Sequence, residues 1–171
     1  RAITDAVAHS DGYGGTEPRY TINTVIANQA EAIDALNQIA SAFRGMTYWG
    51  SNSAVAVADM PSDPVKLVTA ANVVDGDFEY EGSGLRSRHS VFAVTWNDPA
   101  DNYKQQIEIV EDQDLIRKSG WRQADVTAFG CTSRGMAARL GRWMLYSERA
   151  ETEVISYTAG SDHSDLRPGN I

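Results

Sequence analysis

The sequence of 171 residues contains one cysteine, Cys131, and three widely separated histidines, His9, His89 and His163. A single cysteine excludes an internal disulfide and any zinc site built on cysteine pairs, and no histidine stands at metal-ligand spacing. No segment approaches the roughly 18 apolar residues of a membrane-spanning helix, and no signal peptide is visible. We therefore expect no metal, no cofactor and no membrane contact.

Positive charge is also scarce, since 15 Lys and Arg stand against 23 Asp and Glu, for a formal net charge of −8. Nucleic-acid binding depends mostly on basic patches, so we expect no nucleic-acid partner. The apolar fraction of 42% is ordinary for a globular domain that buries a core.

The chain begins at Arg1 and stops at Ile171 within a polar phrase. We expect a piece excised from a larger protein, in which residues 1–16 are a flexible N-terminal segment and residues 17–171 form a single domain. Two stretches rich in glycine and polar residues, 10–18 and 81–88, are interpreted as loops that neighbouring chains could order.

Apolar residues recur at helical spacing in two segments. The first predicts a helix over about 29–44, with Asn28 and Glu31 as a capping box and Gly45 as its stop. The second predicts a helix over about 132–149 whose core face carries Met136, Leu140, Trp143 and Met144. A short helix is predicted over 112–120.

Strands are predicted where apolar residues alternate or cluster between turn signals, over 19–26, 46–50, 53–60, 64–70, 76–82, 121–130 and 151–160. Residues 89–96 and 103–111 are expected to form a β-hairpin across the turn 97–102. Strands and helices do not alternate regularly, which argues against a doubly wound parallel sheet. The predicted fold class is α+β, with mainly antiparallel sheets and two main helices.

Cys131 precedes a helix start and lies near Arg134, a setting in which a thiol can become a nucleophile. A phosphatase-type loop needs its arginine at the position that Met136 occupies here. A papain-like dyad needs a histidine, which the sequence neither places nor excludes. We favour a buried cysteine at the end of a strand, followed by Thr132 or Ser133 as the helix cap.

Four acidic residues occupy alternate positions in the segment 75–81: Asp75, Asp77, Glu79 and Glu81. On a strand they share one face, where a row of carboxylates could bind a hard cation. The segment lacks the glycine and the late glutamate of a calcium-binding EF-hand loop. We therefore favour a solvated strand face, with Phe78 and Tyr80 buried on the opposite side.

The remaining charged and glycine-rich motifs also have structural explanations that need no catalytic or ligand-binding role. Glu111, Asp112 and Asp114 could supply an acid and a base, but they also suit the positive end of the short helix that follows them. The polar side of the last helix is interpreted as a solvated or interfacial face, and it carries Arg139, Arg142, Glu148 and Arg149. The glycines at 12, 14 and 15 lack the lysine and the helix of a phosphate-binding loop.

Four tryptophans could line a sugar-binding site: Trp49, Trp96, Trp121 and Trp143. Each lies inside a periodic apolar pattern, so we interpret them as core and interface residues. The residue patterns thus predict no catalytic, cofactor-binding or metal-binding residue, and no enzymatic activity.

Several longer phrases resemble the central region of the tail tip attachment proteins, also called host specificity protein J, of lambda-like siphophages. The resemblance runs in order from about Glu17 to Ile171, and its ending differs slightly at Asn170. Its phrases include "EPRYTINTVI", "ASAFRGMTYW", "ADMPSDP", "TAANVVDGDFEYEGS", "SVFAVTWNDPADNYK", "DVTAFGCTSRG", "RWMLYSERAETEVISY" and "LRPGNI".

The resemblance implies a structural hub module of a phage or prophage tail tip, related to the baseplate hubs of contractile phages. Such a module would link the tail tube to distal receptor-binding parts. It implies self-association as a homotrimer, contacts with other tail tip, tail tube and tape-measure proteins, and a location in the virion tail tip after assembly in the host cytoplasm. It brings no catalytic residues. The alternatives are a tail-associated hydrolase that uses carboxylates or Cys131, and a carbohydrate-binding module that uses the tryptophans.

Overall fold

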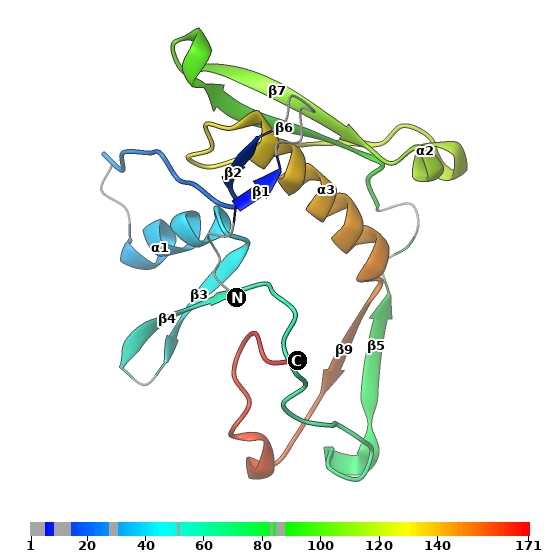
Figure 1. Ribbon diagram of the computed structural model, residues 1–171. Helices are drawn as coiled ribbons and strands as arrows, with labels where there is room; N and C mark the ends of the chain where they lie inside the picture. Colours follow the sequence, from blue (N-terminus) through cyan, green and yellow to red (C-terminus); the bar gives the residue numbers. More distant parts are fainter. Residues whose placement is uncertain (1–5, 9–14, 28–30, 51, 83, 85–87) are drawn as a thin grey trace.

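The computed structural model describes residues 6–8, 15–27, 31–50, 52–82, 84 and 88–171. Within these residues the chain forms three α-helices and four separate sheets, and one strand pair, β6–β8, is parallel. Figure 1 shows one sheet with the long helix α3 across it, and a two-stranded ribbon that extends away from the end of that helix. The α+β prediction is confirmed.

The main core lies between α3 (Arg134–Ala150) and the sheet in which β6 (Val91–Asp98) runs between β7 (Lys104–Glu111) and β8 (Gln123–Thr127). The predicted hairpin is therefore confirmed, with Val91 opposite Glu111 and Asp98 opposite Lys104. Alternate residues of β6 enter this core, as expected for a strand with one face on a helix, and the intervening Val91 and Ala93 are buried as well. The buried cluster comprises Phe92, Val94, Trp96, Val110, Ala128, Cys131, Met136, Ala137, Ala138 and Leu145.

The face of α3 that meets the sheet is made of smaller residues than predicted. A Cβ atom at Gly141 would lie 2.8 Å from Val110 Cγ2 and 3.1 Å from Val94 Cγ2, so the helix backbone packs directly on β6 and β7. Of the predicted core face only Met136 is fully buried, whereas Leu140, Trp143 and Met144 are partly exposed. The sequence-based prediction assigned the bulky residues to the core face. It missed Gly141, which lets the helix approach the sheet closely because it has no side chain.

The start of α3 is tied to the N-terminal strand pair of β1 (Ala6–Ala8) and β2 (Thr16–Pro18). Ser133 caps the helix, because its Oγ accepts a hydrogen bond from the Met136 N–H at 3.3 Å. The same hydroxyl donates to the Glu17 carboxylate, which also pairs with Arg139. A side chain at Gly135 would collide with Glu17, so this glycine allows the carboxylate to reach the helix.

Helix α1 (Ala32–Ser41) is shorter than the predicted 29–44 and leads into a hairpin of β3 (Gly45–Gly50) and β4 (Ser53–Ala58). Glu31 is its N-cap without a side-chain hydrogen bond, and residue 28 lies outside the described residues. Gly45 does not stop the helix. Arg44 instead takes the left-handed conformation at φ 59°, and its carbonyl accepts a 2.9 Å hydrogen bond from the Asp59 N–H at the end of the hairpin.

A ribbon of β5 (Phe78–Gly82) and β9 (Glu153–Tyr157) continues from the last turn of α3 (Figure 1). The expected burial of Tyr80 is wrong, because its side chain is 66% exposed, and Ile155 opposite it is 50% exposed. No third strand or helix of the described residues joins this sheet. Phe78 is half-buried, with its ring 5.9 Å from that of Tyr157.

Two predicted strands do not form, although the others do, with shifted ends. Residues 21–27 and 61–69 have no regular secondary structure. Each of these segments forms only isolated backbone hydrogen bonds with another part of the chain, such as the 2.9 Å bond from Asn23 N–H to Gly130 O. A strand needs a continuous ladder of such hydrogen bonds with a neighbouring strand. The predicted loop 10–18 is wrong at its end, where 16–18 form β2, and most of the predicted loop 81–88 lies outside the described residues.

The short helix is confirmed as α2 (Gln113–Ser119). Asp112 caps it by accepting hydrogen bonds from the Asp114 and Leu115 N–H groups, and Gly120 ends it at φ 81°.

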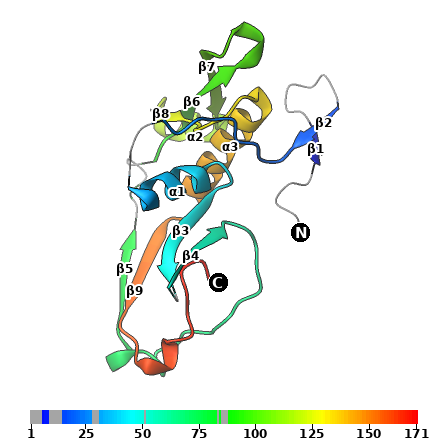
Figure 2. The ribbon, with the colours of Figure 1, turned by 90° about the vertical axis from the view of Figure 1, so that its left-hand side faces the viewer.

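Among the helices that the structure describes, none combines the length and the apolarity needed to cross a bilayer. Figure 2 shows the β1–β2 pair standing at the side of α3, opposite α1 and the β3–β4 hairpin.

Candidate functional site

Cys131 is fully buried in the core, as the favoured interpretation predicted. Its Sγ donates a 3.2 Å hydrogen bond to the carbonyl of Ser133, and burial raises the pKa of the thiol. Arg134, the local candidate for an activator, instead pairs with Glu108 of β7 at 2.7 Å. A raised pKa leaves little thiolate at neutral pH, so the geometry does not activate this cysteine.

We expect Cys131 in the folded chain to react with a water-soluble disulfide reagent at least about 100-fold more slowly than in the unfolded chain, because the buried thiol is reached only when the core opens. Thiol labelling at pH 8, with and without urea, measures this ratio. A rate in the native chain close to the rate in urea would show an accessible thiol and would reopen the nucleophile interpretation.

The structure brings together the predicted carboxylates and two of the predicted arginines. A shallow depression of about 410 Å³ beside α2 is lined by Glu111, Asp112, Asp114, Arg142 and Arg149. The carboxylates serve α2, however, since Asp112 is its cap, and the hydrogen bond from Arg117 lowers the pKa of Asp114. A glycosidase acid needs a raised pKa, so this arrangement does not support hydrolysis.

The acidic row at 75–81 stays in solvent. Asp75, Asp77, Glu79 and Glu81 are all exposed, and Glu79 and Glu81 alternate with Phe78 and Tyr80 along β5. Within the part of the chain that the structure describes, no three His, Cys, Asp or Glu side chains form a group that could hold a metal ion. The solvated-face interpretation accounts for these carboxylates.

The tryptophans come from different elements rather than one platform. Trp96 lies in the main core, whereas Trp49 on β3 and Trp121 before β8 are 69% and 55% exposed. Trp143 is half-buried on α3. The burial of Trp96 prevents a sugar from stacking on its ring, so the four tryptophans do not support a shared sugar site.

The best-formed concavity lies where α3, the end of α1, the β3–β4 hairpin and the C-terminal residues 169–171 meet. It encloses about 570 Å³, within the usual range for ligand pockets. Its wall is mainly apolar and includes Met46, Met60, Phe129, Leu140, Trp143 and Met144. The partly exposed residues of α3 therefore face this cavity.

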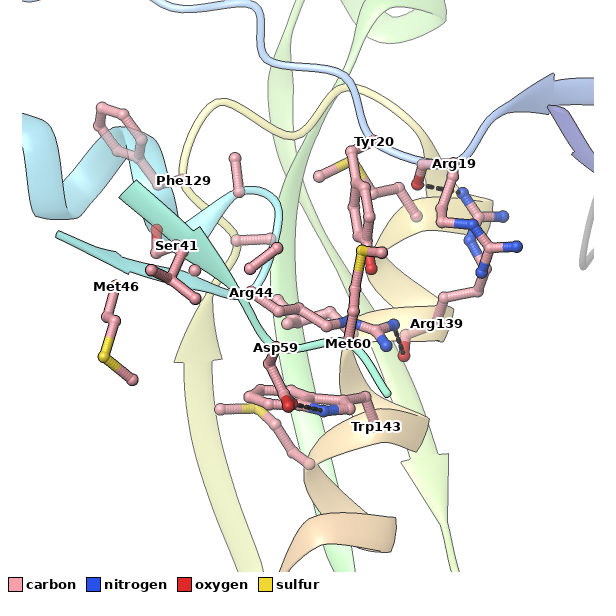
Figure 3. A pocket seen from close by; sticks show the side chains of 18 of the residues that line it. Arg19, Tyr20, Ser41, Arg44, Met46, Asp59, Met60, Phe129, Arg139 and Trp143 are labelled. Carbon is pink, nitrogen blue, oxygen red and sulfur yellow. Dashed lines mark hydrogen bonds between the residues drawn. The ribbon is translucent and has the colours of Figure 1, made fainter. Parts of the chain in front are cut away.

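Arg44 crosses the cavity between two aromatic rings (Figure 3). Its guanidinium carbon lies 5.6 Å from the ring centroid of Tyr20 and 5.3 Å from that of Trp143, both within cation–π range. One guanidinium nitrogen donates to the carbonyl of Arg139 at 3.0 Å, and the Trp143 Nε1–H donates to Asp59 at 3.0 Å. These contacts join the hairpin to α3.

Charged residues of both signs line the cavity. Three arginines line it, Arg19, Arg44 and Arg139, with the carboxylates Asp59 and Glu151. Burial lowers the pKa of Arg44, and the nearby positive charges of Arg139 and Arg19 act in the same direction, whereas Tyr20 and the Asp59 carboxylate act against it. The guanidinium remains protonated at neutral pH, so a cation is held here at a cost that a bound anion would reduce.

The arrangement suits binding better than catalysis. The described residues that line the cavity include neither a histidine nor a cysteine, so they offer no common nucleophile–base pair. Sequence reasoning named Trp143 but missed Tyr20, Arg44 and Asp59. These residues come from segments far apart in the chain, and no local spacing connects them.

Known proteins give an independent result. A family model described as "Putative phage tail protein" matches residues 31–171. Tip attachment protein J of Escherichia phage SECphi27 is 41% identical over 144 residues, which cover 84% of this chain and 12% of that protein. Tip attachment protein J of Escherichia phage SECphi4 is 34% identical over 163 residues, 95% of this chain and 14% of that protein.

The chain therefore spans about one seventh or less of the length of these curated relatives. Both names agree with the resemblance that the sequence phrases predicted, which is confirmed. The matched family segment contains α1, the β3–β4 hairpin and α3, the elements that build the cavity around Arg44. The chain belongs to this family of phage tail proteins.

Proposed function

We propose that this chain is a structural module of a phage tail tip, part of a larger tip attachment protein. The observation that carries the proposal is the similarity of 84% and 95% of the chain to two proteins named tip attachment protein J. In this role the chain acts by packing against other chains, without enzymatic activity, in the virion tail after assembly in the host cytoplasm.

The surface of the chain supports an assembly role. One side of the β5–β9 ribbon carries the partly or fully exposed apolar residues Phe78, Tyr80, Ile155 and Tyr157. A two-stranded ribbon is marginally stable alone in water, so a neighbouring chain that covers this side would complete it. We propose a homotrimer around a three-fold axis as the arrangement, with tail tube and tape-measure proteins as further partners.

A pair of substitutions tests this role. We expect Tyr80→Glu with Ile155→Glu to lower the yield of infectious particles at least about 100-fold, because two charges would be buried in an assembly contact. Glu79→Gln with Glu81→Gln, on the opposite side of β5, is the matched control and should leave the yield unchanged. Plaque titres and electron microscopy of tails measure the effect.

The Glu79 and Glu81 variant should keep the free energy of unfolding within about 0.5 kcal/mol of the unsubstituted chain, because the replaced side chains are exposed. The Tyr80 and Ile155 variant should lose no more than about 1 kcal/mol, because its two exposed glutamates would stand opposite each other across the ribbon. Urea unfolding measures both values. A normal titre with the Tyr80 and Ile155 variant would contradict an assembly role for the ribbon. Loss of infection by intact, normal-looking virions carrying Cys131→Ser would instead favour the tail-associated hydrolase.

A further inference from the structure

The guanidinium of Arg44 has no ion-pair partner among the described residues that line the cavity. Arg139 pairs with Glu17, and one Asp59 oxygen accepts a hydrogen bond from Trp143. Within the described part of the chain, no carboxylate forms an ion pair with the Arg44 guanidinium, whose one side-chain hydrogen bond goes to the backbone carbonyl of Arg139. Arginine binds carboxylates through two parallel hydrogen bonds, so this guanidinium has donors suited to an anion.

The surroundings of Arg44 restrict what that anion can be. Tyr20 and Trp143 hold the guanidinium between their rings, which fixes its plane (Figure 3). Beyond it, Met46, Met60 and Met144 provide flexible apolar side chains, which adapt to varied apolar partners. A strongly hydrated anion such as phosphate would gain little from this wall, whereas a carboxylate on an apolar stem would contact both parts.

We propose that the cavity receives a polypeptide segment of a partner chain that presents an aspartate or glutamate between apolar side chains, with the carboxylate on Arg44. Charge complementarity at one residue carries this assignment, because the half-buried guanidinium of Arg44 has no ion-pair partner among the described residues, whereas Arg139 pairs with Glu17. This inference rests on the proposed assembly function, and it names the chemistry of one contact.

A polypeptide fits the cavity better than a free amphiphile for a structural reason. Residues 169–171 already form part of the wall, and a Cβ atom at Gly169 would lie 2.6 Å from Val57 Cγ1. A stretch of main chain thus packs closely against β4 at this point. A second polypeptide segment would meet the same apolar wall, beside Arg44.

The test uses the indole Nε1–H signal of Trp143, a reporter inside the cavity, in NMR titrations of the chain. The probes are a capped pentapeptide with a central glutamate between leucines, its glutamine counterpart, and decanoate. We expect the glutamate peptide to bind at least about tenfold more tightly than the glutamine peptide, because a charge-assisted pair replaces a neutral hydrogen bond. Decanoate should bind more weakly than the glutamate peptide.

Variants assign the preference to Arg44. Arg44→Gln should remove the tenfold difference, and Arg44→Lys should reduce it because a lysine lacks the planar fork. Arg142→Gln, on the same helix at the separate depression beside α2, is the matched control and should keep the difference. If Arg44→Gln unfolds the chain, the two peptides on the unsubstituted chain still decide the question.

Four results would overturn the inference. Equal affinity for the two peptides, or no shift of the Trp143 signal at millimolar peptide, would show that Arg44 selects no carboxylate. Tighter binding of decanoate would assign the cavity to a free amphiphile. A shift that depends on chain concentration without peptide would assign it to a second copy. None of these results tests the tail-tip location, which particle labelling examines separately.

Discussion

Replacing Gly141 with leucine is expected to destabilise the chain by about 3 kcal/mol, because a side chain there must displace Val94 and Val110 of the packed sheet. Leucine is a better helix former than glycine by nearly 1 kcal/mol, so the strain has to exceed that gain. Urea unfolding followed by tryptophan fluorescence measures the change as a lower midpoint with an unchanged slope.

Arg142→Leu is the control for this substitution, because Arg142 is the next residue of the same helix and is exposed. It should alter the free energy of unfolding by at most about 0.5 kcal/mol. If Gly141→Leu were as stable as Arg142→Leu, α3 would not pack on the sheet at the distance described, and the position of the whole core would be wrong.

Breaking the ion pair between Arg139 and Glu17 should have the other largest effect. Both side chains are mostly buried, at 16% and 10% exposure, so removing the arginine leaves the Glu17 carboxylate buried without this cation, although Ser133 still donates a hydrogen bond to it. We expect Arg139→Met to cost about 3 kcal/mol of unfolding free energy. The comparison is Arg134→Met, because the Arg134 side chain is 59% exposed and its pair with Glu108 should contribute no more than about 1 kcal/mol.

The double variant Arg139→Met with Glu17→Gln identifies the cause. If the loss comes from the unpaired charge, neutralising Glu17 as well should restore a large part of the stability, as double-mutant cycles detect. Chemical denaturation of the four proteins gives the coupling energy. Additive losses in the double variant would show that Arg139 stabilises α3 through packing alone and that Glu17 does not anchor β2.

The elements with strong local signals were predictable. The β6–β7 hairpin, α2 with its Asp112 cap and Gly120 end, and the Ser133 cap of α3 follow from residue types at fixed spacing. Residues 64–70 look like a strand but form none, because strand formation depends on a partner elsewhere in the chain. The role of Gly141 was missed because a glycine contributes by having no side chain, which no pattern of apolar residues reveals.

The candidate site was harder to predict for a related reason. Trp143 stands out in the sequence, but its neighbours in the cavity come from distant segments. Arg44 follows α1, Asp59 follows β4, and Tyr20 precedes both elements. Only the fold brings them together. The burial of Cys131, by contrast, was predictable, because a single cysteine between a strand and the hydroxyl cap of a helix usually packs as a small hydrophobic residue.

The central claim is that the chain is a structural part of a phage tail tip. Immunogold electron microscopy of purified virions of a phage that encodes the chain, with antibodies raised against it, tests this claim most directly. The account predicts gold particles at the distal end of the tail on intact particles. Purified virions that contain no trace of the chain, or gold confined to the capsid, would contradict it.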